Sequence, residues 1–156
     1  GGLHGIMRVR GFTQDDGHIF CTEAQILPEC GDFTALLKKV YADFGFTDIL
    51  YKVATRPAAR IGSDEVWDKA EAALESVLKK MGHPYTINKG DGAFYGPKID
   101  FQVADALKRY HQLSTCQLDF NLPERFKCEY IDKDNTAKRP VMIHRAVLGS
   151  VERFMG

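Results

Sequence analysis

The chain has 156 residues, of which 44% are hydrophobic and 27% are charged; these proportions fit one globular domain with a real core. Its 21 basic and 21 acidic residues give a formal net charge of zero. This balance excludes a free-standing nucleic-acid binder that relies on a basic excess, so any RNA contact must be local or be supported by a further part of the protein.

The first half of the chain predicts strands and helices in mixed order. Residues 6–12 and 17–21 are expected as strands, separated by the polar stretch 13–16. Apolar side chains then recur at helical spacing over residues 33–44, and Gly45 follows as a stop signal. These elements place one amphipathic helix directly after the first two strands.

The remaining elements are a strand, a second helix and then a strand-rich half. Residues 48–54 are apolar and β-branched enough for a strand, and Ser63 is a good N-cap for a helix that ends at Gly82. Apolar and polar residues alternate over 98–103, the pattern of a half-buried strand. Further strands are expected at residues 117–120, 126–131 and 140–143, with a turn at 121–123 and a final helix from about Ala146.

This order predicts the α+β class, with an antiparallel sheet and helices packed on it, because several strands follow one another without helical crossovers. A Rossmann sheet would need alternating strands and helices and a glycine-rich first turn. Neither feature is present in the sequence.

The four cysteines, Cys21, Cys30, Cys116 and Cys128, form no CxxC pair. Such usage indicates a reducing compartment, so we expect a cytoplasmic protein, with an organellar matrix as the alternative. No secretory signal or bilayer-spanning apolar run is evident, so no membrane contact is expected. The chain starts without a methionine and stops after a helical segment, and both ends are expected to be cuts through a larger protein.

Candidate metal and ligand residues gather near the start of the chain. If the local backbone is extended, Gln14, Asp16 and His18 point to one face. The amide and carboxylate suit a small ligand with an ammonium group, and the imidazole suits a divalent metal. The alternative is a solvated polar turn.

His144 follows the apolar residues 141–143 and is a second candidate metal ligand. A catalytic zinc ion needs three protein ligands, and His18 and His144 supply only two. From spacing alone, the pattern favours a hydrogen-bonded histidine of the core over a metal ligand.

Candidate phosphate-binding residues lie at both ends of the chain. Arg8 precedes the aromatic Phe12, which could stack on a base while guanidinium groups hold phosphates. Arg153 follows Ser150 in the final helix, and the glycine-rich residues 90–98 could let a ligand approach the backbone closely. The alternative for each arginine is an ordinary surface position.

Three strings of the sequence resemble one enzyme family. Residues 8–21, RVRGFTQDDGHIFC, resemble the second half of motif 2 of a class II aminoacyl-tRNA synthetase. Residues 92–101, GAFYGPKIDF, and 141–154, VMIHRAVLGSVERF, resemble the threonyl-tRNA synthetases in particular, and the second of these contains motif 3. The resemblance runs over essentially the whole chain.

The resemblance implies an antiparallel sheet flanked by helices and a threonine–tRNA ligase activity. Such an enzyme activates threonine with ATP to threonyl-adenylate and transfers it to the terminal adenosine of tRNA(Thr). The implied cofactors are Mg²⁺ and a Zn²⁺ ion that is held by one cysteine and two histidines and selects the threonine hydroxyl. The resemblance further implies a homodimer in the full-length protein.

The resemblance also gives roles to the residues that match the family. The implied metal ligands are His18 and His144. The implied threonine and adenylate contacts are Gln14, Asp16, Tyr95, Lys98, Gln112, Thr115, Gln117 and Ser150. The implied ATP contacts are Arg8, Phe12 and Arg153, with Lys98 and Arg153 as catalytic residues and His4 near the tRNA.

The sequence departs from the family in three respects. The chain begins inside motif 2, so the half of motif 2 with the arginine that grips the α-phosphate is expected upstream. The third zinc ligand, a cysteine, and motif 1 are expected upstream as well. In residues 113–117 the cysteine stands at Cys116 rather than where the family has it. Anticodon-binding and editing domains are absent, so residues 1–156 are expected to be a partial catalytic domain that is weak or inactive alone. A non-catalytic synthetase-like paralogue, or a module that binds RNA or an amino acid, is the alternative.

Overall fold

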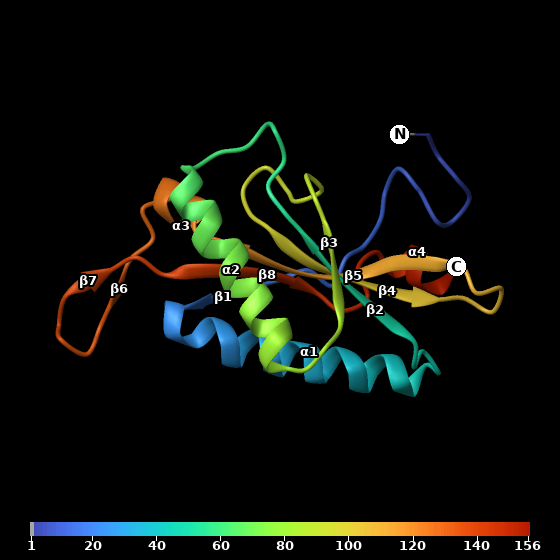
Figure 1. The fold of residues 1–156 in the computed structure, drawn as a ribbon. Coiled ribbons are helices and arrows are strands. Elements are labelled where there is room, and N and C mark those ends of the chain that lie inside the picture. Colours follow the sequence, from blue (N-terminus) through green and yellow to red (C-terminus); the bar gives the residue numbers. More distant parts are fainter. Residues whose placement is uncertain (1) are drawn as a thin grey trace.

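A six-stranded sheet forms the centre of the computed structural model, which describes residues 2–156 (Figure 1). Its strands are β1 Gly17–Cys21, β2 Ile49–Ala54, β3 Tyr85–Asn88, β4 Lys98–Ala104, β5 Tyr110–Asp119 and β8 Val141–Ala146. The α-helices are α1 Ile26–Asp43, α2 Asp64–Lys80, α3 Asn121–Arg125 and α4 Val151–Met155, and a short 3₁₀ helix, η1 Glu23–Gln25, precedes α1. Strands β6 Tyr130–Ile131 and β7 Ala137–Lys138 form a separate hairpin.

The order of the strands confirms the predicted α+β class. The sheet runs β1-β8-β5-β4-β2-β3, and every pair in it is antiparallel except β2 with β3. Helix α2 connects these two strands, as a parallel pair requires, because parallel neighbours need a crossover. The sheet is therefore antiparallel with one parallel edge.

Helices α1 and α2 pack on the same face of the sheet and bury the core (Figure 1). Alternate residues of β4, Ile99, Phe101 and Val103, point toward the helices and are buried, which confirms the predicted alternation. The residues between them face the other side of the sheet. That side is free of α1 and α2 and carries the candidate site.

Both predicted long helices are present. Helix α1 extends further toward the N-terminus than the spacing over 33–44 predicts, and Gly45 follows it with φ of +83°, a conformation that favours glycine. Helix α2 begins after Ser63, whose hydroxyl accepts a hydrogen bond from the amide of Val66. The N-cap predicted at Ser63 is therefore confirmed.

Two predicted strands are wrong. Residues 6–12 form only isolated bridges, since His4 and Arg8 exchange backbone hydrogen bonds in a tight loop and no neighbouring strand lies beside them. Within 126–131 only Tyr130 and Ile131 are in a strand. The predicted turn at 121–123 lies in helix α3, which explains why the following chain does not continue the sheet.

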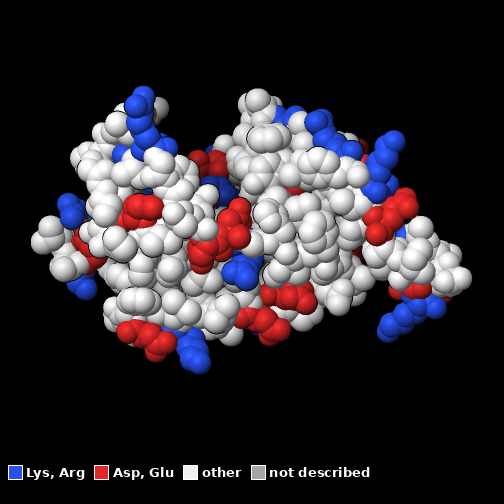
Figure 2. All heavy atoms as spheres, turned by 180° about the vertical axis from the view of Figure 1, so that it is seen from behind, with Lys and Arg blue, Asp and Glu red and all other residues white. Residues whose placement is uncertain are grey.

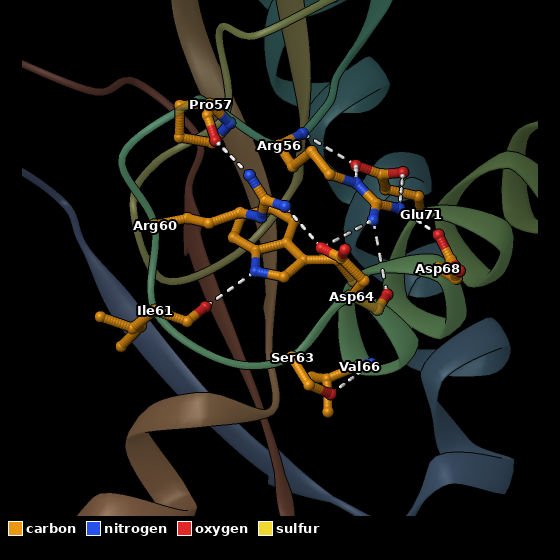
Figure 3. A network of polar contacts seen from close by, with 10 residues as sticks. Arg56, Pro57, Arg60, Ile61, Ser63, Asp64, Val66, Asp68 and Glu71 are labelled. Atoms are coloured by element: carbon orange, nitrogen blue, oxygen red, sulfur yellow. Dashed lines mark hydrogen bonds and ion pairs between the residues drawn. The ribbon is translucent and has the colours of Figure 1, made fainter.

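The segment between β2 and α2 is fixed by an ion-pair network (Figure 3). The guanidinium group of Arg56 pairs with Glu71 at 2.7 Å and also contacts Asp68 and Asp64. Arg56 also donates its backbone amide to Glu71 at 2.8 Å. One arginine thus joins the end of β2 to successive turns of α2.

Across residues 2–156, the helices lack the combination of length and apolar character that a membrane span requires.

Candidate functional site

Four of the predicted site residues form one row across the sheet. His18 on β1 pairs with His144 on β8, His144 pairs with Gln117 on β5, and Gln117 pairs with Lys98 on β4. Side chains that are directly opposite on neighbouring strands share a face, and this row lies on the face away from α1 and α2. Figure 2 shows the molecule from behind, with acidic and basic side chains mixed over this side and both kinds inside a recess near its middle.

The two histidines are in direct contact at one end of the row. Their ring centroids are 4.7 Å apart and the rings are edge to face. His18 is exposed, whereas the side chain of His144 is 12% exposed. Nε2 of His144 lies 2.9 Å from Oδ2 of Asp119, so the second imidazole is held by a carboxylate.

Tyr95 joins the row from the glycine-rich segment. Its hydroxyl donates to Oε1 of Gln117 at 2.6 Å, and its ring centroid lies 5.0 Å from that of His144. Gln117 donates in turn to the carbonyl oxygen of Gly96 at 3.1 Å. A side chain on Gly96 would place its Cβ 2.1 Å from the carbonyl oxygen of Leu118, so glycine is required for this close approach.

Lys98 belongs to a polar cluster around one buried carboxylate. Nζ of Lys98 lies 3.2 Å from Oδ2 of Asp100. Oδ1 of the same carboxylate accepts from Nε2 of Gln112 at 2.6 Å and from the hydroxyl of Thr115 at 3.4 Å. Burial raises the pKa of Asp100, and the nearby charge of Lys98 opposes that shift.

The segment before β1 is anchored to the turn after β8 by Asp15. Its carboxylate accepts hydrogen bonds from the backbone amides of Val147, Leu148 and Gly149 at 2.9 to 3.1 Å. Successive backbone amides of this kind form a concave site for an anion. The two ends of the chain therefore meet at the site, as the distribution of the motifs requires.

A second contact joins the same two segments, with the carboxylate now on the C-terminal one. The carboxylate of Glu152 accepts from the backbone amide of Thr13 at 3.0 and 3.1 Å, and Gln14 forms a β-bridge with Ser150. The hydroxyl of Ser150 caps helix α4 by accepting from the amide of Arg153. Strand β1 begins at Gly17, so Gln14 and Asp16 lie on the segment before the sheet, whereas His18 lies within it.

Asp16 is exposed on the segment that leads into β1. It contributes to the raised pKa of Tyr95, after burial and the charge of Asp119. Its carboxylate therefore acts electrostatically on the same tyrosine that contacts Gln117 and His144.

Arg8, Arg153 and His4 line one open pocket of about 870 Å³. Asp105 and Arg109 from the turn between β4 and β5, and His111 from the start of β5, also line this pocket. Phe12 is 55% exposed and is not among the lining residues. The structure thus brings Arg8 and Arg153, the two predicted phosphate-binding arginines, to one pocket, but it does not bring Phe12 there.

Sequence reasoning missed three carboxylates that position the candidate residues, namely Asp15, Asp100 and Asp119. Asp119 stands two residues before the amide of Asn121, a spacing typical of a side chain that caps a helix or turn. That signal could have identified Asp119. The roles of Asp15 and Asp100 depend on contacts between strands and could not be predicted from local sequence.

Neutral imidazoles suit zinc, and His18 and His144 lie together on one face with the second ring held by a carboxylate. Residues 2–156 contain no group of three histidine, cysteine or carboxylate side chains arranged to hold a metal ion. The described residues thus bring two candidate zinc ligands together, one fewer than the three protein ligands of a catalytic zinc site.

The sequence and the fold of the chain match a known family. Residues 2–156 match the tRNA synthetase class II core domain (G, H, P, S and T), and the chain belongs to that family. A more distant fold match, apo histidyl-tRNA synthetase of S. aureus, has a TM-score of 0.58 at 15% identity over 94% of this chain and 39% of that one.

Within this family, the similar curated proteins are named threonine–tRNA ligase. The proteins of Leptothrix cholodnii and Delftia acidovorans are 67% and 66% identical over all 156 residues. The chain covers 24% of each of them, so it spans about a quarter of their length. These matches confirm the resemblance to threonyl-tRNA synthetases.

Two solved structures agree with this finding. The RNA binding domain of threonyl-tRNA synthetase from Cryptosporidium parvum has a TM-score of 0.92 at 50% identity, over 97% of this chain and 38% of that one. A putative threonyl-tRNA synthetase from Aeropyrum pernix has a TM-score of 0.84 at 32% identity, over 99% and 37%.

Proposed function

We propose that the protein containing this chain is a threonine–tRNA ligase, with residues 1–156 forming its catalytic domain from the motif 2 loop to motif 3. The row of His18, His144, Gln117 and Lys98 on one face of the sheet carries this proposal. It combines metal-binding imidazoles, a hydrogen-bonding amide and a cation within one site. The curated relatives named threonine–tRNA ligase support threonine as the amino acid.

Two displacements make up the proposed reaction. The carboxylate of threonine attacks the α-phosphorus of ATP, which enters with Mg²⁺, and pyrophosphate leaves. The terminal hydroxyl of tRNA(Thr) then attacks the carbonyl carbon of threonyl-adenylate, and AMP leaves. Both steps build negative charge on oxygen, which positioned cations stabilise.

We assign the cationic roles to Lys98, Arg153 and Arg8. Lys98 lies in the row and would face the reacting phosphate, whereas Arg8 and Arg153 would hold the remainder of ATP from their shared pocket. Phe12 would stack on adenine, a role that requires it to move toward this pocket. His4 would lie near the tRNA.

The threonine pocket would extend along the row from the two histidines to the polar cluster around Lys98. Gln14 and Asp16 would meet the ammonium group, and the remaining contacts would come from Tyr95, Gln112, Thr115, Gln117 and Ser150. A zinc ion held by His18 and His144, and by a third ligand outside residues 2–156, would supply a Lewis acid for the hydroxyl of threonine. A site that bonds this hydroxyl rejects valine, which has the same shape but lacks it.

Threonine-dependent exchange of pyrophosphate into ATP tests this function in the complete protein. We expect exchange that Lys98→Ala and Arg153→Ala reduce strongly, while the control Lys39→Ala, on the exposed side of α1, leaves it unchanged. Exchange with another amino acid in place of threonine, or none at all, would contradict the proposal. A protein that binds amino acid or RNA without exchange would instead be a non-catalytic paralogue.

The isolated chain should behave differently from the complete protein. We expect very weak exchange or none, because the motif 2 arginine that would grip the α-phosphate and the proposed third zinc ligand would both lie outside this chain, and residues 2–156 have no three-ligand metal group. The same exchange assay on residues 1–156 measures this, and robust activity would contradict the assignment of the zinc site. The proposal also includes a cytoplasmic homodimer, which the mass of the complete protein in solution would test.

A further inference from the structure

Asp119 is the last residue of β5 and is fully buried. Its Oδ1 accepts hydrogen bonds from the backbone amides of Asn121 at 2.8 Å and Leu122 at 2.9 Å, at the start of α3. Its Oδ2 lies 2.9 Å from Nε2 of His144. Both carboxylate oxygens are therefore engaged, one with a helix and the other with a candidate metal ligand.

This contact selects one tautomer of His144. A carboxylate only accepts hydrogen bonds, so the nitrogen that faces Asp119 must carry the proton. A neutral imidazole has one N–H and one lone pair, so Nδ1 of His144 is left with the lone pair. Only Nδ1 can then bind a metal ion.

The surroundings of His144 hold the ring in this orientation. The ring contacts His18 edge to face at 4.7 Å and lies 5.0 Å from the ring of Tyr95. These aromatic contacts restrict the ring but do not distinguish its two nitrogens. Asp119 alone among these three neighbours makes that distinction, because it bonds one nitrogen.

We propose that Asp119 is the positioning residue that makes His144 bind zinc through Nδ1. This inference rests on the proposed function, since it takes His18 and His144 as zinc ligands. An outer carboxylate that accepts the other N–H of a ligating histidine fixes its tautomer and raises its basicity. Asp119 fits this role because its second oxygen ties it to the start of α3.

Asp119→Asn in the complete protein provides the sharpest test. Asparagine has nearly the same volume, and its amide oxygen can still accept from the amides of Asn121 and Leu122. Its NH₂ group would then face Nε2 of His144 and donate to it. That reverses the tautomer and places a proton on Nδ1, where zinc should bind.

Zinc affinity, measured with zinc alone by competition with a chromophoric chelator, should fall about 10- to 100-fold in this variant. The visible spectrum of the cobalt-substituted protein should change as well, which a loss of stability without a change in ligation would not cause. Asp105→Asn is the matched control, because Asp105 lies 3.0 Å from Nε2 of His111 and away from the histidine pair. It should leave zinc affinity unchanged.

Unaltered zinc affinity and an unaltered cobalt spectrum in Asp119→Asn would overturn the role of Asp119 while leaving the zinc site in place. Absence of zinc binding by the unmodified protein would instead overturn the zinc site itself, and this inference with it. If the variant does not fold, a crystal structure of the zinc-loaded unmodified protein decides. Zinc on Nδ1 of His144 supports the inference, and zinc on Nε2 overturns it.

Discussion

Lys98 and Asp100 form an ion pair of 3.2 Å on the face of the sheet that carries the candidate site. The carboxylate is buried, and the amide of Gln112 bonds its other oxygen. Lys98 and Asp100 are two residues apart on β4, so their side chains share a face. The ion pair therefore holds the ammonium group of Lys98 in the row that contains Gln117 and the two histidines. A fixed cation stabilises developing charge without reorganising during the reaction.

Asp100→Asn should therefore impair catalysis more than threonine binding. The amide keeps the volume of the carboxylate but removes the charge that orients Lys98. We expect kcat for pyrophosphate exchange to fall by up to about 100-fold, the cost of a slightly misplaced group, with a smaller change in KM for threonine. Asp48→Asn, at an exposed carboxylate bonded to Tyr110, is the control, and an unchanged kcat in Asp100→Asn would contradict the role.

The sequence predicted correctly the elements that are marked by capping residues or by a clear hydrophobic pattern, such as α2 and β4. Helix α2 begins after the N-cap Ser63, is followed by Gly82 with φ of +69°, and has a clear apolar stripe. Strand β4 alternates because one face meets the helices. The strand predicted at residues 6–12 is not formed. A local pattern cannot show whether a neighbouring strand is available, and a segment joins a sheet only when another strand forms hydrogen bonds with it.

The candidate site could not be assembled from local patterns. His18 and His144 are opposite one another because β1 and β8 pair in a particular register, and register depends on packing across the sheet. Residue spacing alone favoured a core histidine at His144, and only the family resemblance linked His144 to His18 as a metal ligand. The structure adds that His144 is hydrogen-bonded to the buried Asp119 and also contacts the ring of His18.

Gly149→Ala should destabilise the protein strongly. Gly149 has φ of +69°, and a Cβ there would lie 2.2 Å from the carbonyl oxygen of Leu113. Gly45→Ala is the matched control, because Gly45 has φ of +83° and open space around it. Both variants should lose about 1–2 kcal/mol through the left-handed backbone.

Only Gly149→Ala should lose about 1–3 kcal/mol more from overpacking. Urea unfolding followed by circular dichroism measures both free energies of unfolding. Equal losses in the two variants would show that the close approach of Gly149 to β5 is not required.

Arg56→Lys should destabilise the connection between β2 and α2 although it keeps the positive charge. The guanidinium group contacts Glu71 through both Nε and a terminal nitrogen, at 3.1 and 2.7 Å, and its side chain is only 23% exposed (Figure 3). A lysine ammonium cannot reproduce this forked geometry. We expect a loss of about 1–3 kcal/mol, measured by urea unfolding, whereas Arg10→Lys at an exposed position should cost nothing measurable.

The thiol of Cys21 should be slow to react in the folded protein. Burial raises its pKa from the ordinary 9.0 to about 11, and the nearby Cys30 and Glu29 add to the shift. The thiolate is the reactive form, so little of it is present at pH 8. Alkylation by iodoacetamide, followed by peptide mass spectrometry, should label the partly exposed Cys128 first.

The raised pKa of Cys21 also predicts how stability depends on pH. Between about pH 9 and pH 11 the folded chain keeps the proton that the unfolded chain has lost, so the free energy of unfolding falls as pH rises through this range. The slope from this one group approaches about 1.4 kcal/mol per pH unit. Cys21→Ala should remove that slope in urea unfolding series from pH 8 to pH 11, and a slope unchanged by the substitution would assign the effect to other groups, such as the buried Tyr41, whose pKa burial also raises.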